Sequence, residues 1–169
     1  MDNEKKITIF RCFILAFIIV LVATAQNTLS MVFQIGGARC FIIVPVVVAV
    51  GMFENEGTSA FLGLFAGMLI DMVSGVQMGY NAIILCFTAL CCSLFVSNIM
   101  RSTILTSLIF NSISIVVYVV LYWLFFMIFA GVEDGAKSLF TFYLPSAVYT
   151  FIVSPFIFSF IRAIRKRLI

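Results

Sequence analysis

Long apolar runs separated by short polar linkers divide this chain into six segments. A bilayer core about 30 Å thick requires roughly 20 apolar residues in a helix that crosses it. The pattern therefore predicts an all-α integral membrane protein with six transmembrane helices in one bundle. The second segment is long enough only if its helix starts near residue 33, because its strongly apolar part starts at Phe41. Residues 1–169 are expected to form a single membrane domain, with spans at about 7–29, 33–53, 59–73, 80–100, 103–129 and 139–161.

Small and polar residues recur at helical spacing inside the last three spans. In the fifth span they step by three or four positions, which places them on one helix face. Helices in lipid associate through small residues and hydrogen bonds, so such stripes predict seams between helices. The alternative is a polar pathway for an ion or solute, although the fifth span carries no ionisable group with a near-neutral pKa. The stripes are Thr103, Ser107, Asn111, Ser114, Tyr118 and Tyr122 in the fifth span, Ser146, Thr150 and Ser154 in the sixth, and Ala82, Ala89, Ser93 and Ser97 in the fourth.

Two prolines lie inside predicted spans. Pro45 falls in the second and Pro155 in the sixth. Each removes one backbone donor and is expected to kink its helix, as a packing feature rather than as part of a transport mechanism.

The third span places a carboxylate inside an apolar run. Gly63, Gly67 and Asp71 are spaced by four residues and share one helix face, and Gly75 and Gly79 continue the spacing beyond it. A G-x-x-x-G pair lets another helix backbone approach closely. A charged side chain costs about 2.5–3.5 kcal/mol at the bilayer centre and less toward the interface. In the last turn of its helix, Asp71 also opposes the helix dipole.

A residue as unfavourable as Asp71 is expected to have a partner. One candidate is the start of the fourth helix at Gly79-Tyr80-Asn81, whose free N–H groups attract an anion. The other candidate is Arg39 in the first loop. We expect Asp71 to hold the ends of the third and fourth helices together, and the alternative is a carboxylate that only reaches interfacial water.

The composition agrees with a membrane protein and argues against an enzyme. The chain is 64% hydrophobic and 10% charged, whereas soluble domains carry roughly 25% charged residues. It has no histidine, no nucleophile–base pair and no second membrane aspartate, so no catalytic site is expected. The five cysteines form no C-x-x-C pair and are interpreted as buried thiols, so neither a metal nor a cofactor is expected.

The basic residues predict the orientation. With six spans both termini lie on one side, which would hold eight basic residues against two on the other side. This excess places both termini in the cytoplasm. The cluster at the C-terminus is therefore attributed to the membrane side and not to a nucleic-acid partner. The eight are Lys5, Lys6, Arg11, Arg101, Arg162, Arg165, Lys166 and Arg167, and the two are Arg39 and Lys137.

The N-terminal segment has an alternative interpretation. Lys5-Lys6, an apolar run and Ala23-Thr24-Ala25 together resemble a signal peptide with its cleavage site. The apolar run continues past that site, which favours an uncleaved first helix.

The third span and its surroundings resemble a known family. The residues FENEG (53–57), GLFAGMLIDMVSG (63–75) and MGYNA (78–82) are similar to the G-x-x-x-G-x-x-x-D-x-x-S-G block and the following L-G-x-N-A of the rod shape-determining protein MreD family. LPSAVYT (144–150), which contains Pro145 and Tyr149, looks like the last-helix pattern of that family. Ser146 stands where the family often has an acid, and any role of that acid is not expected here. The basic C-terminal tail also fits.

The resemblance implies a non-enzymatic scaffold or regulator of lateral peptidoglycan synthesis in the bacterial inner membrane. Its implied partners are an MreC-like protein, an MreB-like filament and the side-wall peptidoglycan synthases. The implied fold is similar to the substrate-binding component of energy-coupling-factor transporters. Such a vitamin-binding component is therefore the alternative function, with Trp123, Tyr118, Tyr122 and Asn81 as candidate pocket residues. However, Ala16, Ala23 and Ala25 lack the A-x-x-x-A spacing of those proteins.

Overall fold

The computed structural model describes residues 2–32, 41–74, 79–99, 102–124 and 144–167, and within them the chain is helical with no strand. Five of the helices are long and apolar enough to cross a membrane. The chain is therefore a multi-pass membrane protein. The helices are α1 (Asp2–Val32), α2 (Ile43–Phe53), α3 (Glu56–Ser74), α4 (Tyr80–Asn98), α5 (Ile104–Trp123) and α7 (Leu144–Arg167).

The second span differs from its prediction. Its helix begins at Ile43 and not near residue 33, and it contains only 11 residues. At about 1.5 Å per residue it is about 16 Å long, roughly half of a bilayer core. Pro45 lies in the first turn of this helix, where a residue has no N–H acceptor within the helix, so the reason for expecting a kink does not apply there.

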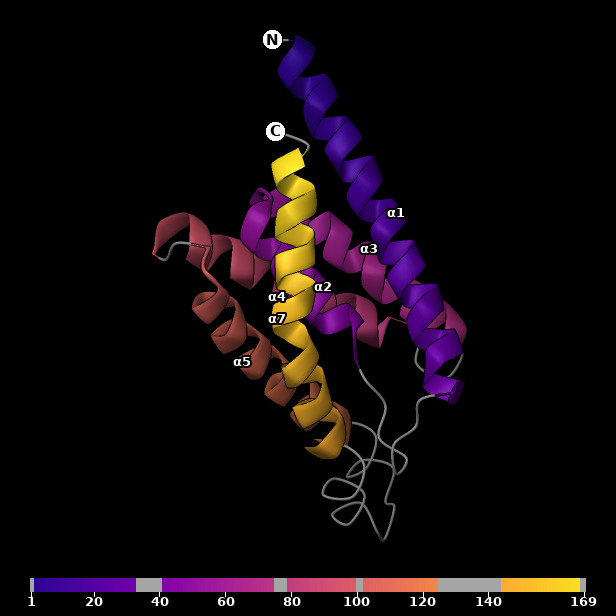
Figure 1. Ribbon diagram of the computed structural model, residues 1–169. Coiled ribbons are helices and arrows are strands. Elements are labelled where there is room, and N and C mark those ends of the chain that lie inside the picture. Colours follow the sequence, from indigo (N-terminus) through magenta and orange to yellow (C-terminus); the bar gives the residue numbers. More distant parts are fainter. Residues whose placement is uncertain (1, 33–40, 75–78, 100–101, 125–143, 168–169) are drawn as a thin grey trace, which may run out of the picture.

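Helix α2 lies at the centre of the molecule (Figure 1). It contacts each of the other five described helices, and all of its residues are buried. A helix that is apolar on every side is typical of a buried core element. The closely packed pair α3–α4 lies on one side of it, the antiparallel pair α5–α7 lies on another, and α1 packs mainly against α3. The start of α1 and the end of α7 lie at the same end of the bundle (Figure 1), called here the terminal end.

The N-terminal end of α2 is satisfied by side chains from outside. The Ile43 N–H donates to Oε1 of Gln26 in α1 at 2.9 Å. The Phe41 N–H donates to Oγ1 of Thr150 in α7 at 3.0 Å. The first N–H groups of a helix that starts inside a bundle cannot donate to water. The side chains of Gln26 and Thr150 serve as their acceptors instead.

The other spans lie close to their predicted positions. Helix α1 extends beyond residues 7–29 at both ends, and α3 begins at Glu56, before the expected residue 59. Helix α7 continues past the expected end at residue 161 to Arg167 and contains Pro155. The predicted end of the fifth span and the start of the sixth fall in residues 125–143, outside the described residues.

The predicted polar stripes are interhelical seams. Nearly all of their described members are buried, whereas large apolar side chains on other faces are exposed, as expected for surfaces that contact lipid. Thr103 and Ser97, at helix ends, are the exposed members, and the side chain of Tyr122 is outside the description. The buried members are Ser107, Asn111, Ser114 and Tyr118 in α5, Ser146, Thr150 and Ser154 in α7, and Ala82, Ala89 and Ser93 in α4.

Candidate functional site

The predicted glycine face of α3 contacts α4 directly. A Cβ atom at Gly63 would lie 2.8 Å from Cβ of Ala89, and a Cβ atom at Gly67 would overlap the backbone of Ala82. Gly51 of α2 approaches the same helix, since a Cβ there would lie 2.8 Å from the Ala89 carbonyl oxygen. Contacts below 3.0 Å are almost never seen for real Cβ atoms. The three glycines therefore permit backbone approaches that no other residue allows.

Asp71 lies in the last turn of α3, and its carboxylate accepts hydrogen bonds from the start of α4. Oδ2 accepts hydrogen bonds from the N–H groups of Gly79 at 3.0 Å and Ala82 at 3.1 Å. Oδ1 accepts from the N–H of Asn81 at 3.3 Å and from its Nδ2 at 2.8 Å. The side chain is buried, with 4% of its residue surface exposed. Of the two candidate partners, the start of the fourth helix is the one observed, and Arg39 lies outside the described residues.

The local backbone explains this arrangement. Gly79 caps α4 with φ at +94°, a left-handed conformation that glycine adopts at little cost. The first N–H groups of a helix have no partner within the helix and carry its positive dipole end. A carboxylate placed there gains charge-assisted hydrogen bonds. The same group that opposes the dipole of α3 therefore stabilises the beginning of α4.

A series of side-chain hydrogen bonds extends this site to α5. The Tyr118 hydroxyl donates to Oδ1 of Asn81 at 2.6 Å, so Asn81 links Asp71 to Tyr118. The Tyr118 ring also packs against the rings of Phe41 and Tyr80, with centroids 5.3 and 6.3 Å apart. We call Asp71, Gly79, Asn81, Ala82 and Tyr118 the Asp71 site.

The Asp71 site joins the end of α3 to the start of α4. A carboxylate offers about four acceptor positions, and each oxygen of Asp71 already accepts two hydrogen bonds. The group is thus engaged by donors from one helix start. This geometry suits an anchor of α3 to α4.

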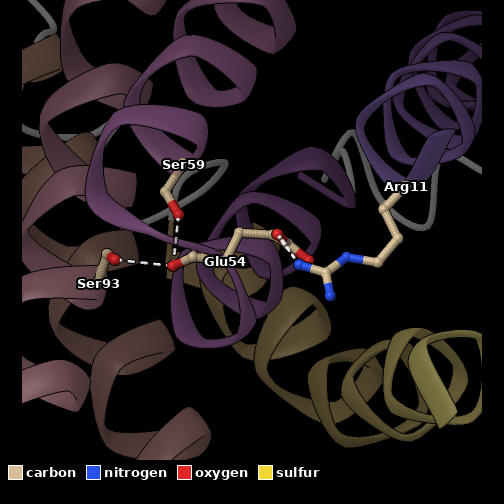
Figure 2. Close-up of polar contacts among 4 residues, drawn as sticks. All are labelled: Arg11, Glu54, Ser59 and Ser93. Atoms are coloured by element: carbon tan, nitrogen blue, oxygen red, sulfur yellow. Dashed lines mark hydrogen bonds and ion pairs between the residues drawn. The ribbon is translucent and has the colours of Figure 1, made fainter. Parts of the chain in front are cut away.

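A second polar cluster surrounds Glu54, and Figure 2 shows its contacts. The carbonyl oxygen of Glu54, directly after α2, accepts hydrogen bonds from Oγ of Ser59 at 3.1 Å and of Ser93 at 2.9 Å. Its carboxylate forms an ion pair with Nη2 of Arg11 at 2.7 Å. Side-chain exposure is only 2% for Glu54 and 18% for Arg11. We call Arg11, Glu54, Ser59 and Ser93 the Glu54 cluster, and it joins α1, α2, α3 and α4.

The remaining predicted site residues are dispersed. Asn111 is fully buried in α5, and its Nδ2 donates to Oγ of Ser107 at 3.4 Å. Pro145 is exposed in the first turn of α7, a position that proline favours, and Tyr149 is half-buried one turn further on. Gly75 lies outside the described residues. The structure therefore brings Gly63, Gly67, Asp71, Gly79 and Asn81 together and leaves Asn111, Pro145 and Tyr149 apart from them.

Arg11 and Gln26 are structural partners that were not predicted from the sequence. Both were visible as polar residues within the first predicted span, where a polar group is costly and requires a partner. Arg11 was used only to predict orientation, and Glu54 only as part of a family pattern.

Comparison with known proteins gave no match to a protein-family model, to a curated protein or to a solved structure.

Proposed function

We propose that this chain is a non-enzymatic membrane scaffold, of the MreD type, in the machinery that elongates rod-shaped bacterial cells. One observation carries the proposal. The residues on which the resemblance rests, from Phe53 to Ala82, include Glu54 and Ser59 of the Glu54 cluster and most of the Asp71 site. They hold α2, α3 and α4 together through backbone approach and hydrogen bonds. A scaffold requires a motif whose residues hold its helices in a fixed arrangement.

The proposal includes a location and an orientation. The chain would lie in the inner membrane with both termini in the cytoplasm, where Arg162, Arg165 and Lys166 meet the anionic membrane surface. The shared terminal end of α1 and α7 (Figure 1) supports a common side for the termini. A fold similar to the substrate-binding component of energy-coupling-factor transporters, with α2 counted as a sixth segment, belongs to the same proposal.

The proposed partners are an MreC-like protein, an MreB-like filament and the side-wall peptidoglycan synthases. The vitamin-transporter alternative would need free polar groups around a pocket. Two of its candidate residues are instead engaged within the protein, because Tyr118 donates to Asn81 and Asn81 donates to Asp71. This engagement supports the scaffold.

Depletion in the rod-shaped host tests the proposal. Loss of the protein should turn rods into spheres, and expression of the parent chain should restore rods. A variant with Gly57→Ala, at a position with open space around it, should restore them equally well. Cells that remain rod-shaped after the protein has disappeared from the membrane fraction would contradict the proposal.

Purification separates the two functions. A scaffold of this type should co-purify from the membrane with an MreC-like protein identified by mass spectrometry. Tight binding of a vitamin by the purified chain, with no such partner, would favour the transporter component instead.

A further inference from the structure

A narrow crevice opens between α1, α2 and α7 at the terminal end. Its free volume is about 10 Å³, enough for one water molecule. Leu15, Phe53 and Ile161 give it apolar walls, and Arg11 and Arg165 line it together with Glu54. We call it the arginine crevice.

The positive charge of the arginine crevice is only partly compensated. Arg11 pairs with Glu54 at 2.7 Å, whereas the guanidinium of Arg165 lies over the Phe53 ring, 5.2 Å from its centroid. The two cations and one anion leave one net positive charge. The Nε atoms of both arginines are buried and have no hydrogen-bond partner. Buried donors without partners are rare and costly, and here two of them line one crevice.

The surroundings are those of a lipid-facing site. Phe10 and Phe160, next to the crevice residues in sequence, are exposed on α1 and α7. Arg165, Glu54 and Glu56 also line an adjoining polar hollow of about 500 Å³, to which Asn55 and Ser97 contribute. The positive charge is therefore concentrated in the crevice and not in the hollow. The two arginines thus stand between an apolar helix surface and a polar hollow.

We propose that the arginine crevice binds the phosphate of an anionic phospholipid. The phosphate sits at the mouth and accepts hydrogen bonds from Arg11 and Arg165, since guanidinium donors match phosphate oxygens. The polar head group extends into the hollow, and the acyl chains follow the exposed faces of α1 and α7. Basic pockets between transmembrane helices commonly hold such head groups.

Charge and width favour a lipid over a protein occupant. A water molecule fits the crevice but leaves the net positive charge in place. A partner helix is about 10–12 Å across with its side chains, so its backbone stays outside the crevice, and one acidic side chain would be its only means of compensating the charge. A phosphate at the mouth supplies the missing negative charge and offers several acceptor oxygens to the guanidinium groups, and its acyl chains have the exposed apolar faces of α1 and α7 beside them. This inference depends on membrane insertion but not on the scaffold function.

Lipid binding to the purified chain in detergent tests the proposal by native mass spectrometry. The probes are dioleoyl phosphatidylglycerol, which is anionic, and dioleoyl phosphatidylcholine, which is zwitterionic. The parent chain should prefer the anionic lipid. Arg165→Gln should weaken that binding by about fivefold to tenfold, the effect of one basic residue near a membrane surface. Glu54→Gln keeps an acceptor for Arg11 but removes the competing charge, so it should strengthen the binding.

Arg162→Gln is the matched control, because it removes the same charge from the same helix at an exposed position outside the crevice. It should leave anionic lipid binding within about twofold of the parent, since the lost charge does not face the phosphate. Equal losses in Arg162→Gln and Arg165→Gln would reduce the effect to general surface charge and overturn the proposal. Equal affinity of the parent for both lipids would also overturn it. An effect of Arg165→Gln on self-association alone would assign the crevice to a second copy of the chain.

Circular dichroism of each variant shows whether the bundle is intact. If Arg165→Gln does not fold, Arg165→Lys replaces it, because lysine keeps the charge but loses the fork of donors. Binding of the anionic lipid by Arg165→Lys should be weaker than in the parent, but by less than the fivefold to tenfold loss expected for Arg165→Gln. Unchanged binding by a folded Arg165→Lys, at the affinity of the parent, would overturn the role of the guanidinium.

Discussion

Replacement of Asp71 by asparagine tests the anchor between α3 and α4 at nearly constant size. The carboxylate accepts four hydrogen bonds at 2.8–3.3 Å from Gly79, Asn81 and Ala82. An asparagine oxygen can accept about two of them, and its amide nitrogen, itself a donor, faces the remaining donors.

The expected loss of stability follows from these bonds. A hydrogen bond to a charged group contributes about 1.5–3 kcal/mol in proteins generally, whereas side-chain hydrogen bonds measured inside a membrane protein average about 0.6 kcal/mol. Loss of two bonds therefore lowers the free energy of unfolding by about 1–6 kcal/mol, with the lower half of this range favoured by the membrane values.

The assay is unfolding of the purified protein in mixed micelles with an increasing fraction of SDS, followed by circular dichroism. Glu56→Gln is the control, because it makes the same chemical change in the exposed first turn of the same helix. It should change the free energy of unfolding by at most about 0.5–1 kcal/mol. Equal unfolding curves for Asp71→Asn and the parent chain would refute the anchor.

Other contacts give graded predictions in the same unfolding assay. Gly67→Ala should destabilise by about 1–3 kcal/mol, because its Cβ would overlap the backbone of α4, whereas Gly57→Ala should be neutral or stabilising by up to about 1 kcal/mol. Tyr118→Phe should cost about 0.5–1.5 kcal/mol through the lost bond to the Asp71 site. Gln26→Ala should cost about 1–3 kcal/mol, because the first N–H of α2 loses its acceptor. Equal stability of both glycine variants, or no loss in the other two, would contradict these assignments.

Features that lipid makes costly could be predicted from the sequence. Polar and small residues must face protein in a membrane bundle, so the stripes that contain Asn111 and Ser154 indicated buried faces, and both residues are fully buried. The isolated acid Asp71 likewise indicated a partner, and its position near the helix end left two candidates, the next helix start and Arg39. In each case the cost of exposing a polar group to lipid left few alternatives.

Features that depend on long-range pairing could not be predicted. An apolar run such as residues 41–53 is equally consistent with a helix that spans the membrane and with a short helix buried by its neighbours. What distinguishes them is the set of side chains around Ile43, and Gln26 lies 17 positions away in sequence. Arg11 and Glu54 are 43 positions apart, and nothing in their local sequences pairs them. Such contacts arise from the packing of the whole bundle.

The short central helix has a consequence for the order of assembly. Helices that span a bilayer can insert singly and associate afterwards, but α2 is about half of that length. The N–H of Phe41, just before it, needs an acceptor on Thr150, 109 positions further along the chain. In a chain synthesised from its N-terminus, that acceptor emerges after α3, α4 and α5. The hairpin of α3 and α4 can therefore form early with partners of its own, whereas the centre of the bundle is completed only when α7 arrives.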